Sequence, residues 1–207
     1  MQTILRIDSS SRLTGSRSRQ LGDYCEAKLV SPNRRILRRD LATDPVEQIH
    51  QNTITGFYTA ANALTPELKA ATALSDKLIG EVQAADALII TAPIYNFGVP
   101  ASLKAWIDQI VRIGHTFSFD GTSFGGLAKP KTAIVCTAFG ASGYQDGQPF
   151  RAANFLEPYL RFLFNFLGIP AVHFIAVQST TAEVAVVEAG IAAAKTEIDR
   201  LLSEVRI

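Results

Sequence analysis

Residues 87–91 read ALIIT, residues 132–137 read TAIVCT and residues 172–177 read VHFIAV. These short runs are almost wholly apolar and rich in β-branched residues, which predicts strands covered by helices on both faces, as in a parallel sheet. Two further runs, at residues 3–7 and 35–38, bring the number of predicted strands to five. The run at 35–38 lies within RRILRR, and its polarity predicts an edge strand.

Segments of helical period lie between these runs. Thr65 and Pro66 predict a helix start, because threonine is a good N-cap and proline suits the first helical position. The chain shows no internal repeat and no Pro/Gly/Ser linker. We therefore expect a single domain over residues 1–207, of the α/β class, with a doubly wound five-stranded parallel sheet and helices on both faces. Apolar stripes at helical spacing run through Leu21, Tyr24, Cys25 and Leu29, through Leu68, Ala71, Leu78 and Val82, and through Val184, Val187, Ile191, Ala194, Ile198, Leu201 and Val205.

The composition argues against several classes of protein. The 207 residues include 20 basic and 19 acidic ones, so the net charge of +1 gives no broad attraction to nucleic acid or to an anionic membrane. Arg6 and Asp8 interrupt the amino-terminal apolar stretch, and no run approaches the roughly 20 apolar residues of a membrane span. We expect no nucleic acid partner, no membrane association and a cytoplasmic location.

Cysteine and histidine are sparse and scattered. Cys25 and Cys136 form no CxxC motif, and both are predicted to be buried apolar residues. His50, His115 and His173 have no metal-ligand spacing with one another or with a cysteine. The sequence therefore predicts neither a disulfide nor a metal site.

A hydroxyl-rich loop, DSSSRLTGSRSRQ at residues 8–20, follows the first predicted strand and enters the first helix. Serine hydroxyls and the free N–H groups of a helix start bind phosphate oxygens well. Arg12, Arg17 and Arg19 crowd that positive helix end, which is favourable when an anion lies among them. The loop has neither GxGxxG nor GxxxxGK, so a monophosphate is the better prediction. In the alternative interpretation the serines only cap the helix, and Arg19 pairs with Asp23.

A second distinctive loop, APIYNFGVPASLKAWID at residues 92–108, follows the third predicted strand. Pro93 and Pro100 stiffen it, and Tyr95 and Phe97 bring aromatic area to the sheet end. Such a loop suits a flat heteroaromatic ligand, whereas in the alternative the two rings only plug the sheet. Four later residues are predicted to be ordinary core: Leu103, Trp106, Ile107 and Ile110.

The segment PIYNFGVPASLKAWID at residues 93–108 resembles the flavin loop of the FMN-dependent NADH:quinone oxidoreductases, also called FMN-dependent azoreductases, of the flavodoxin-like superfamily. Similar segments follow in the family's order over essentially the whole chain, among them IDSSSRLTGSRSRQL, LTPELKAATALSDKLI, GHTFSF, TAFGASGYQDG and EPYLRFLFNFLGI. The resemblance implies a flavodoxin-like fold, one FMN per subunit, NADH or NADPH as electron donor, and a quinone or azo compound as acceptor. It also implies a homodimer with both sites at the subunit boundary.

The resemblance also implies which residues form the site. The phosphate of FMN would be held by Ser10, Ser16, Arg17 and Ser18, and the isoalloxazine ring would lie along Ile94, Tyr95, Asn96 and Phe97. The other edge of the ring would meet Ala138, Phe139, Gly140 and Ala141, and the substrate pocket would include Phe119 and Phe124. Two positions depart from the family pattern. Arg17 replaces a common glutamine, which should strengthen phosphate binding, and AFGAS replaces a common Ser-Arg-Gly-Gly.

Aromatic residues gather in two later segments. In GHTFSFDGTSFGG, residues 114–126, Phe117, Phe119 and Phe124 predict either a flap over the open face of the site or a small packed hairpin. A second group is denser than one helix usually buries, so we expect part of it in a dimer interface: Phe155, Tyr159, Phe162, Phe164 and Phe166.

No catalytic side chain is required, because hydride chemistry on a flavin is the cofactor's own. If loops cover one face of the ring, donor and acceptor must use the other face in turn, which predicts ping-pong kinetics. Two other classes are weighed against this enzyme. A flavodoxin-type electron carrier, or a redox-sensing flavoprotein, would have no small-molecule substrate, although carriers tend to be strongly acidic. A serine esterase built on Ser9 would need a histidine base, and nothing in the sequence places one there.

Overall fold

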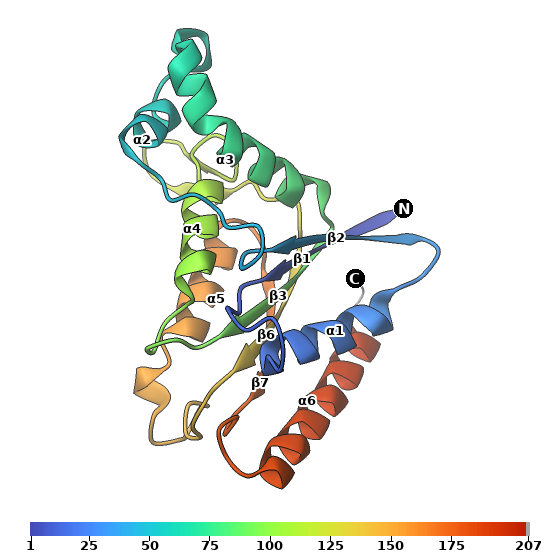
Figure 1. Ribbon diagram of the computed structural model, residues 1–207. Coiled ribbons are helices and arrows are strands. Elements are labelled where there is room, and N and C mark those ends of the chain that lie inside the picture. Colours follow the sequence, from blue (N-terminus) through green and yellow to red (C-terminus); the bar gives the residue numbers. More distant parts are fainter. Residues whose placement is uncertain (206–207) are drawn as a thin grey trace.

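The computed structural model describes residues 1–205, and its centre is a parallel five-stranded sheet in the order β2-β1-β3-β6-β7 (Figure 1). Each predicted run is a strand of this sheet, and the arginine-rich strand lies at an edge, as predicted. The doubly wound α/β fold is thereby confirmed, while residues 206–207 of the predicted single domain lie outside the described part. The strands are β1 (Gln2–Asp8), β2 (Arg34–Asp40), β3 (Ala87–Pro93), β6 (Thr132–Ala138) and β7 (Ala171–Val177).

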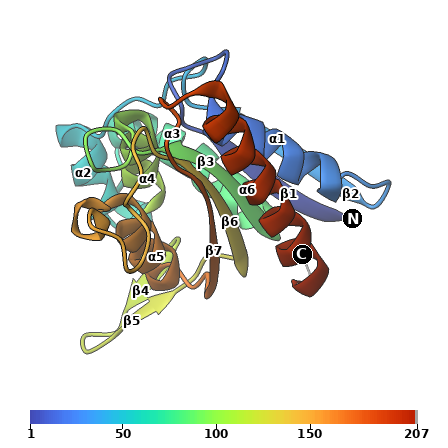
Figure 2. The same cartoon turned by 90° about the horizontal axis from the view of Figure 1, so that it is seen from below.

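Helices cover both faces of the sheet (Figure 2). On one face, α1 (Arg17–Leu29) and α6 (Val184–Glu204) pack with Ile4, Ile89 and Ile134. On the other, α3 (Pro66–Ala84), α4 (Ala101–Ile110) and α5 (Leu156–Phe166) pack with Leu5, Leu88 and Val135. Neighbouring residues of each central strand therefore pack into opposite layers, which explains why β3 and β6 are almost wholly apolar.

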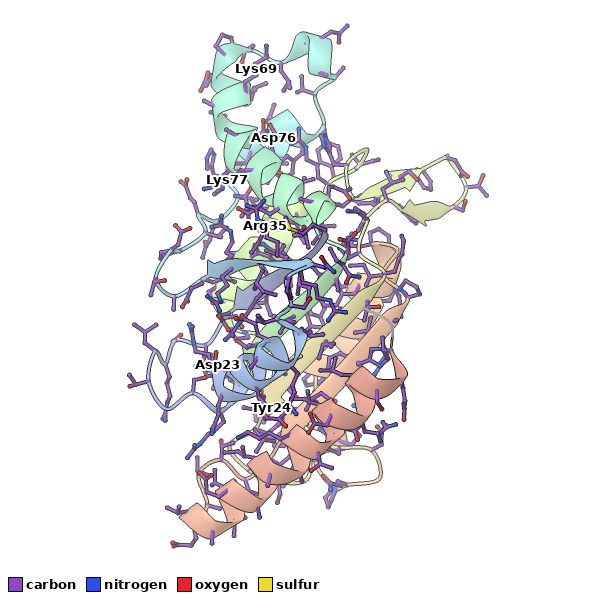
Figure 3. The ribbon with its side chains drawn as sticks, turned by 90° about the vertical axis from the view of Figure 1, so that its right-hand side faces the viewer. Asp23, Tyr24, Arg35, Lys69, Asp76 and Lys77 are labelled. Carbon is purple, nitrogen blue, oxygen red and sulfur yellow. The ribbon has the colours of Figure 1, made fainter. Side chains whose placement is uncertain are left out.

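Local sequence fixes where the helices begin and how they meet. Thr65 accepts a hydrogen bond from the Leu68 N–H at 3.3 Å, and Pro66 is the first residue of α3, as predicted. Tyr24 on α1 lies towards α6 (Figure 3), and its hydroxyl donates to Asp199 at 2.8 Å. Short elements complete the fold: α2 (Gln51–Phe57), which lies with the first half of α3 beyond the sheet in Figure 1, and the 3-10 turns Ala61–Ala63 and Arg151–Ala153.

Residues 117–126 form a small antiparallel hairpin of β4 (Phe117–Phe119) and β5 (Phe124–Gly126). It packs on the last residues of α5, with the rings of Phe117 and Phe166 4.9 Å apart. Since α5 leads from that end into the start of β7, the hairpin lies at the amino end of the sheet. Of the two interpretations of this segment, the packed hairpin is confirmed.

Gly22 lets α1 approach the sheet closely. A Cβ at this position would lie 2.4 Å from Thr91 Cγ2 on β3 and 3.4 Å from Arg6 Nη2 on β1. By contrast, a Cβ at Gly80, on the exposed side of α3, would meet nothing within 4 Å. These two helical glycines therefore differ: Gly22 is needed for the close packing of α1 on the sheet, whereas the position of Gly80 has room for a side chain.

We expect Gly22→Ala to lower the free energy of unfolding by roughly 1–3 kcal/mol, because the added methyl group overpacks the contact between helix and sheet. Gly80→Ala is the matched control and should raise it by roughly 0.5–1 kcal/mol, since alanine favours the helix. Urea denaturation of both variants measures the difference. Equal effects of the two substitutions would contradict the close approach.

Candidate functional site

A crevice opens at the carboxyl ends of four strands of the sheet. Its volume is about 270 Å³. It spans the boundary between β1 and β3, where the strand order reverses, which is the usual ligand site of doubly wound sheets. Four loops line it, contributing Ser10, Arg12, Gly15, Ser16 and Arg17 after β1, Pro93, Ile94 and Tyr95 at the end of β3, Ala138 and Gly140 after β6, and Thr180 and Thr181 after β7.

The structure brings together most of the residues predicted from sequence. Of the twelve predicted cofactor residues, those that line the crevice are Ser10, Ser16, Arg17, Ile94, Tyr95, Ala138 and Gly140. The other five are Ser18, Asn96, Phe97, Phe139 and Ala141. Ser18 is wholly buried behind the loop, with its hydroxyl 3.3 Å from that of Ser16. Asn96 and Phe97 form the tip of a turn beyond Tyr95.

Ser16 both caps α1 and lines the crevice. Its hydroxyl accepts a hydrogen bond from the Arg19 N–H at 3.4 Å, so the capping interpretation holds for this serine. The Ser10 hydroxyl accepts from the Arg12 N–H at 3.3 Å, and the Ser11 N–H donates to the Tyr95 hydroxyl at 3.3 Å. The loop after β1 is thus bonded to the loop after β3.

The three arginines of this loop divide into two kinds. Arg12 and Arg17 line the crevice, and Arg17 lies 3.6 Å from Glu188 of α6. Arg19 does not line it. Its guanidinium donates to both carboxylate oxygens of Asp40, at 2.6 and 2.7 Å, which raises the pKa of Arg19 and lowers the pKa of Asp40. Among the described residues, Arg12 thus has no carboxylate partner, whereas Arg17 already pairs with Glu188.

The alternative pairing of Arg19 with Asp23 is wrong, because Asp23 pairs with Arg6 at 2.7 Å. Arg6 is buried under α1 and also lies 3.0 Å from Asp8 and 3.2 Å from Glu26. Burial alone would lower the pKa of Arg6, but Asp8 and Asp23 offset it and the pKa is raised. A buried ionic network therefore underlies the serine loop.

The aromatic loop makes a strained two-residue turn. Tyr95 and Gly98 exchange two backbone hydrogen bonds of 3.1 Å, and between them Asn96 and Phe97 have φ angles of +46° and +72°. A turn with two left-handed residues favours Asn-Gly, so Phe97 occupies a glycine position at a cost of roughly 1–2 kcal/mol. The Phe155 N–H donates to the Phe97 carbonyl at 3.1 Å and holds the turn. Phe97 itself is 54% exposed at the tip of the turn and is not among the residues that line the crevice.

The loop after β6 turns its aromatic ring inward. Phe139 is fully buried, its ring lies 5.1 Å from that of Tyr144, and its N–H donates to the Val177 carbonyl at 2.9 Å. Its side chain and N–H are therefore committed to the core. Ala138 and Gly140 are the residues of this loop that reach the crevice.

Sequence reasoning missed Thr180 and Thr181. Their hydroxyls donate to the carbonyls of Phe139 at 3.1 Å and Gly140 at 2.9 Å, so their oxygens offer a ligand acceptor lone pairs. The signal was present in the sequence, since QSTT follows the last strand as DSSS follows the first. Both hydroxyl-rich segments leave the sheet at the same end.

The predicted substrate residues Phe119 and Phe124 lie outside the crevice. Both are on the hairpin at the amino end of the sheet and are 46% and 61% exposed. Beside the crevice, a mostly apolar pocket of about 830 Å³ opens between the aromatic loop and α5. Tyr95 lines both cavities, and the pocket is also lined by Asn96, Gly98, Val99, Ala101, Lys104, Phe155, Pro158 and Tyr159.

Several other predictions meet the structure here. The Ser9 hydroxyl is buried and donates to the Thr91 carbonyl at 2.7 Å, so an esterase nucleophile at this position is wrong. Cys25 and Cys136 are buried free thiols, and burial raises the pKa of Cys25 to about 12. Within residues 1–205, no cluster of metal-ligating side chains is found, and no helix has the length and apolarity to cross a membrane.

Comparison with known proteins agrees with this geometry. The family model of the flavodoxin-like fold matches residues 2–202. An FMN-dependent NADH:quinone oxidoreductase of Xanthobacter autotrophicus is 54% identical over 170 residues, which is 81% of this chain and 82% of that protein. One from Beijerinckia indica is 39% identical over 191 residues, 91% and 94% of the two chains.

Solved structures show the same fold. The crystal structure of an azoreductase from Bacillus anthracis superposes with a TM-score of 0.88 at 22% identity, over 99% of this chain and 100% of that one. A second, of an FMN-dependent NADH-azoreductase from Bacillus anthracis in complex with FMN, gives 0.84 at 24% identity, over 97% and 99%. The resemblance noted in the sequence is thereby confirmed. The chain belongs to the flavodoxin-like fold family and, within it, to the family of the FMN-dependent NADH:quinone oxidoreductases.

Proposed function

We propose that this protein is an FMN-dependent oxidoreductase that passes electrons from NADH to quinones and that also cleaves aromatic azo compounds reductively. One observation carries the proposal: a single crevice joins a serine-rich helix start with two arginines to an aromatic turn, at the switch point of the sheet. The names of the relatives, FMN-dependent NADH:quinone oxidoreductase and FMN-dependent NADH-azoreductase, support it. NADH is therefore favoured over NADPH as the donor.

The residues at the crevice fit a flavin monophosphate. Among the described residues, Arg12 has no carboxylate within salt-bridge distance, so the helix start has positive charge to spare for a phosphate. Ser10, Ser16 and Arg17 would hold that phosphate, with Ser18 supporting Ser16 from behind. The ring would lie against Ile94, Tyr95, Asn96 and Phe97, and its other edge would meet Ala138, Gly140 and Ala141, with Phe139 anchoring that loop in the core.

FMN, when bound, supplies the two-electron hydride chemistry. The chain itself binds and orients the ring and keeps water from the face that the loops cover. If the loops close that face of the ring, donor and acceptor would use the remaining face one after the other, which would give ping-pong kinetics. A quinone takes two electrons and an azo bond four, so quinone reduction needs a single cycle, and we propose it as the main task.

The first test is the visible spectrum and the steady-state kinetics of the purified protein. We expect flavin absorption that denaturation releases, NADH oxidation that depends on added quinone, and parallel double-reciprocal plots. Intersecting plots would contradict the alternating use of one face. Flavin without quinone-dependent NADH oxidation would favour an electron carrier or a redox-sensing flavoprotein, and protein that neither retains nor takes up FMN would refute the proposal.

We propose further that the protein is a homodimer. Phe162 on α5 is 72% exposed, and its ring lies 6.3 Å from that of Phe166, which lies 5.5 Å from the ring of Phe124 on the neighbouring hairpin. With Phe119, 4.7 Å from Phe124, these rings form an exposed apolar surface, and Phe155, just before α5, is 64% exposed. The hairpin lies at the opposite end of its own sheet, so Phe119 and Phe124 would complete the substrate pocket of a second subunit. A cytoplasmic location stays a prediction from the sequence.

Sedimentation analysis at micromolar concentration tests the dimer. We expect a dimeric mass for the wild type and a monomer for Phe162→Glu, because a charge within an apolar interface is costly to desolvate. Val30→Glu replaces a 63% exposed residue at the end of α1 and should leave the mass unchanged. A monomeric wild type would contradict the proposal.

The strained turn gives a separate prediction about cofactor binding. Phe97→Gly should raise the free energy of unfolding by roughly 1 kcal/mol, because glycine adopts positive φ without strain, yet weaken FMN binding through loss of the ring. Tyr58→Gly is the control, since Tyr58 is 80% exposed but has a φ of −102°, and it should destabilise the fold. Urea denaturation and fluorescence titration with FMN measure both effects. Loss of stability in Phe97→Gly similar to that in Tyr58→Gly would show that the turn stores no strain.

A further inference from the structure

Arg19 bonds the serine loop at Ser10 from the side away from the crevice. Its Nη2 donates to the Ser10 carbonyl at 2.8 Å, while its Nη1 and Nη2 donate to the Asp40 carboxylate at 2.6 and 2.7 Å. The Arg19 side chain is only 12% exposed and does not line the crevice. One guanidinium thus joins the first turn of α1, the loop after β1 and the end of β2.

Asp40 is itself held in place. Its carboxylate accepts from the Ala42 N–H at 3.0 Å, and next to it the Leu41 N–H donates to the Asp8 carbonyl at 2.8 Å. The pair of Arg19 and Asp40, called the clamp below, is therefore anchored on the paired ends of β1 and β2. Its position relative to the sheet does not depend on the loop that it holds.

The same guanidinium also faces the buried network. Arg19 Nη1 lies 3.9 Å from the Asp8 carboxylate, which accepts from the Thr91 hydroxyl at 2.7 Å and is paired with Arg6. Without Arg19, the carboxylates of Asp8 and Asp40 would lose their shared cation. The loop would then lose both its tie to the sheet and the charge balance beneath it.

We propose that Arg19 and Asp40 are positioning residues for the phosphate of the flavin. By drawing the Ser10 carbonyl to the Arg19 side, they keep this acceptor away from the anion and leave Ser10 and Ser16 at the crevice. They thereby determine how strongly the protein prefers a phosphorylated flavin to an unphosphorylated one. This inference rests on the proposed function, because it concerns the same crevice.

In the competing account, Arg19 binds the phosphate directly. The two accounts predict opposite effects of Asp40→Asn on the affinity for FMN. If Arg19 were a phosphate ligand restrained by Asp40, Asp40→Asn would release it and tighten FMN binding. If Arg19 acts through Ser10, Asp40→Asn removes the anchor and weakens FMN binding. Riboflavin separates a third account, general damage to the fold, because it has the same ring without the phosphate.

The experiment titrates the full-length apoprotein with FMN and with riboflavin, following flavin fluorescence, in the wild type, Arg19→Met, Asp40→Asn and Asp44→Asn. Asp44→Asn is the matched control: the same chemical change on the same segment, at a carboxylate that bonds Arg39 at 2.6 Å and does not touch the loop. We expect the Kd for FMN to rise at least tenfold in Arg19→Met and Asp40→Asn, and the Kd for riboflavin to change less than twofold. Both should be unchanged in Asp44→Asn.

The competing outcomes are distinct. The positioning role of Arg19 and Asp40 would be refuted by any of three results: tighter FMN binding in Asp40→Asn, an equal rise in the Kd for FMN and for riboflavin, or no change in either Kd. Competition by inorganic phosphate against FMN is a second readout, and its inhibition constant should rise in Asp40→Asn alone of the two asparagine variants. If Arg19→Met fails to fold, the near-isosteric Asp40→Asn still distinguishes the positioning role from direct phosphate binding. A wild type that binds neither flavin would instead refute the proposed function.

Discussion

The site depends on a row of alternating charges where α1 meets the sheet, buried at Glu26, Arg6 and Asp8 and half-buried at Arg19 and Asp40. It runs from Glu26 through Arg6 and Asp8 to Arg19 and Asp40, and each neighbouring pair lies within 3.9 Å. Removing one member of such a row leaves a buried charge without its partner, which typically costs several kcal/mol, more than one exposed ion pair contributes. The row also ends beneath the serine loop. The constraint that holds α1 on the sheet is thus the same one that gives the loop its shape.

Most of the fold could be predicted from the sequence because burial on both faces leaves a simple mark. Leu88 and Ile89 pack into opposite layers, so ALIIT is almost wholly apolar, whereas the arginines of β2 are tolerated because β2 lies at the edge of the sheet. Which carboxylate pairs with which arginine leaves no comparable pattern in the sequence. Arg19 stands four residues before Asp23 on one helix, yet it bonds Asp40, 21 residues away, because β2 pairs with β1 and brings Asp40 beside Asp8.

Site residues could be predicted where the type of side chain is itself the signal. They were harder to predict where the backbone conformation sets the direction of the side chain. Ser10, Ser16 and Tyr95 were found because hydroxyl and aromatic groups at strand ends are unusual. Phe139 was misjudged as a crevice residue because the direction of its ring depends on the turn that places it against Tyr144. The place of the hairpin at the amino end of the sheet follows from its position between α4 and β6, which is a property of topology and not of its own residues.

The loops around the crevice are bonded to one another as well as to the sheet. Ser11 bonds Tyr95, Phe155 bonds Phe97, Ile94 bonds Ala138, and Thr180 bonds Phe139. Each loop is therefore held by its neighbour, which lets the strained turn at Asn96 and Phe97 persist without a ligand. A site that must hold a large planar cofactor and contributes no acid or base of its own needs rigidity above all. These cross-links provide it, so changes in the supporting bonds should alter cofactor affinity before they alter the chemistry.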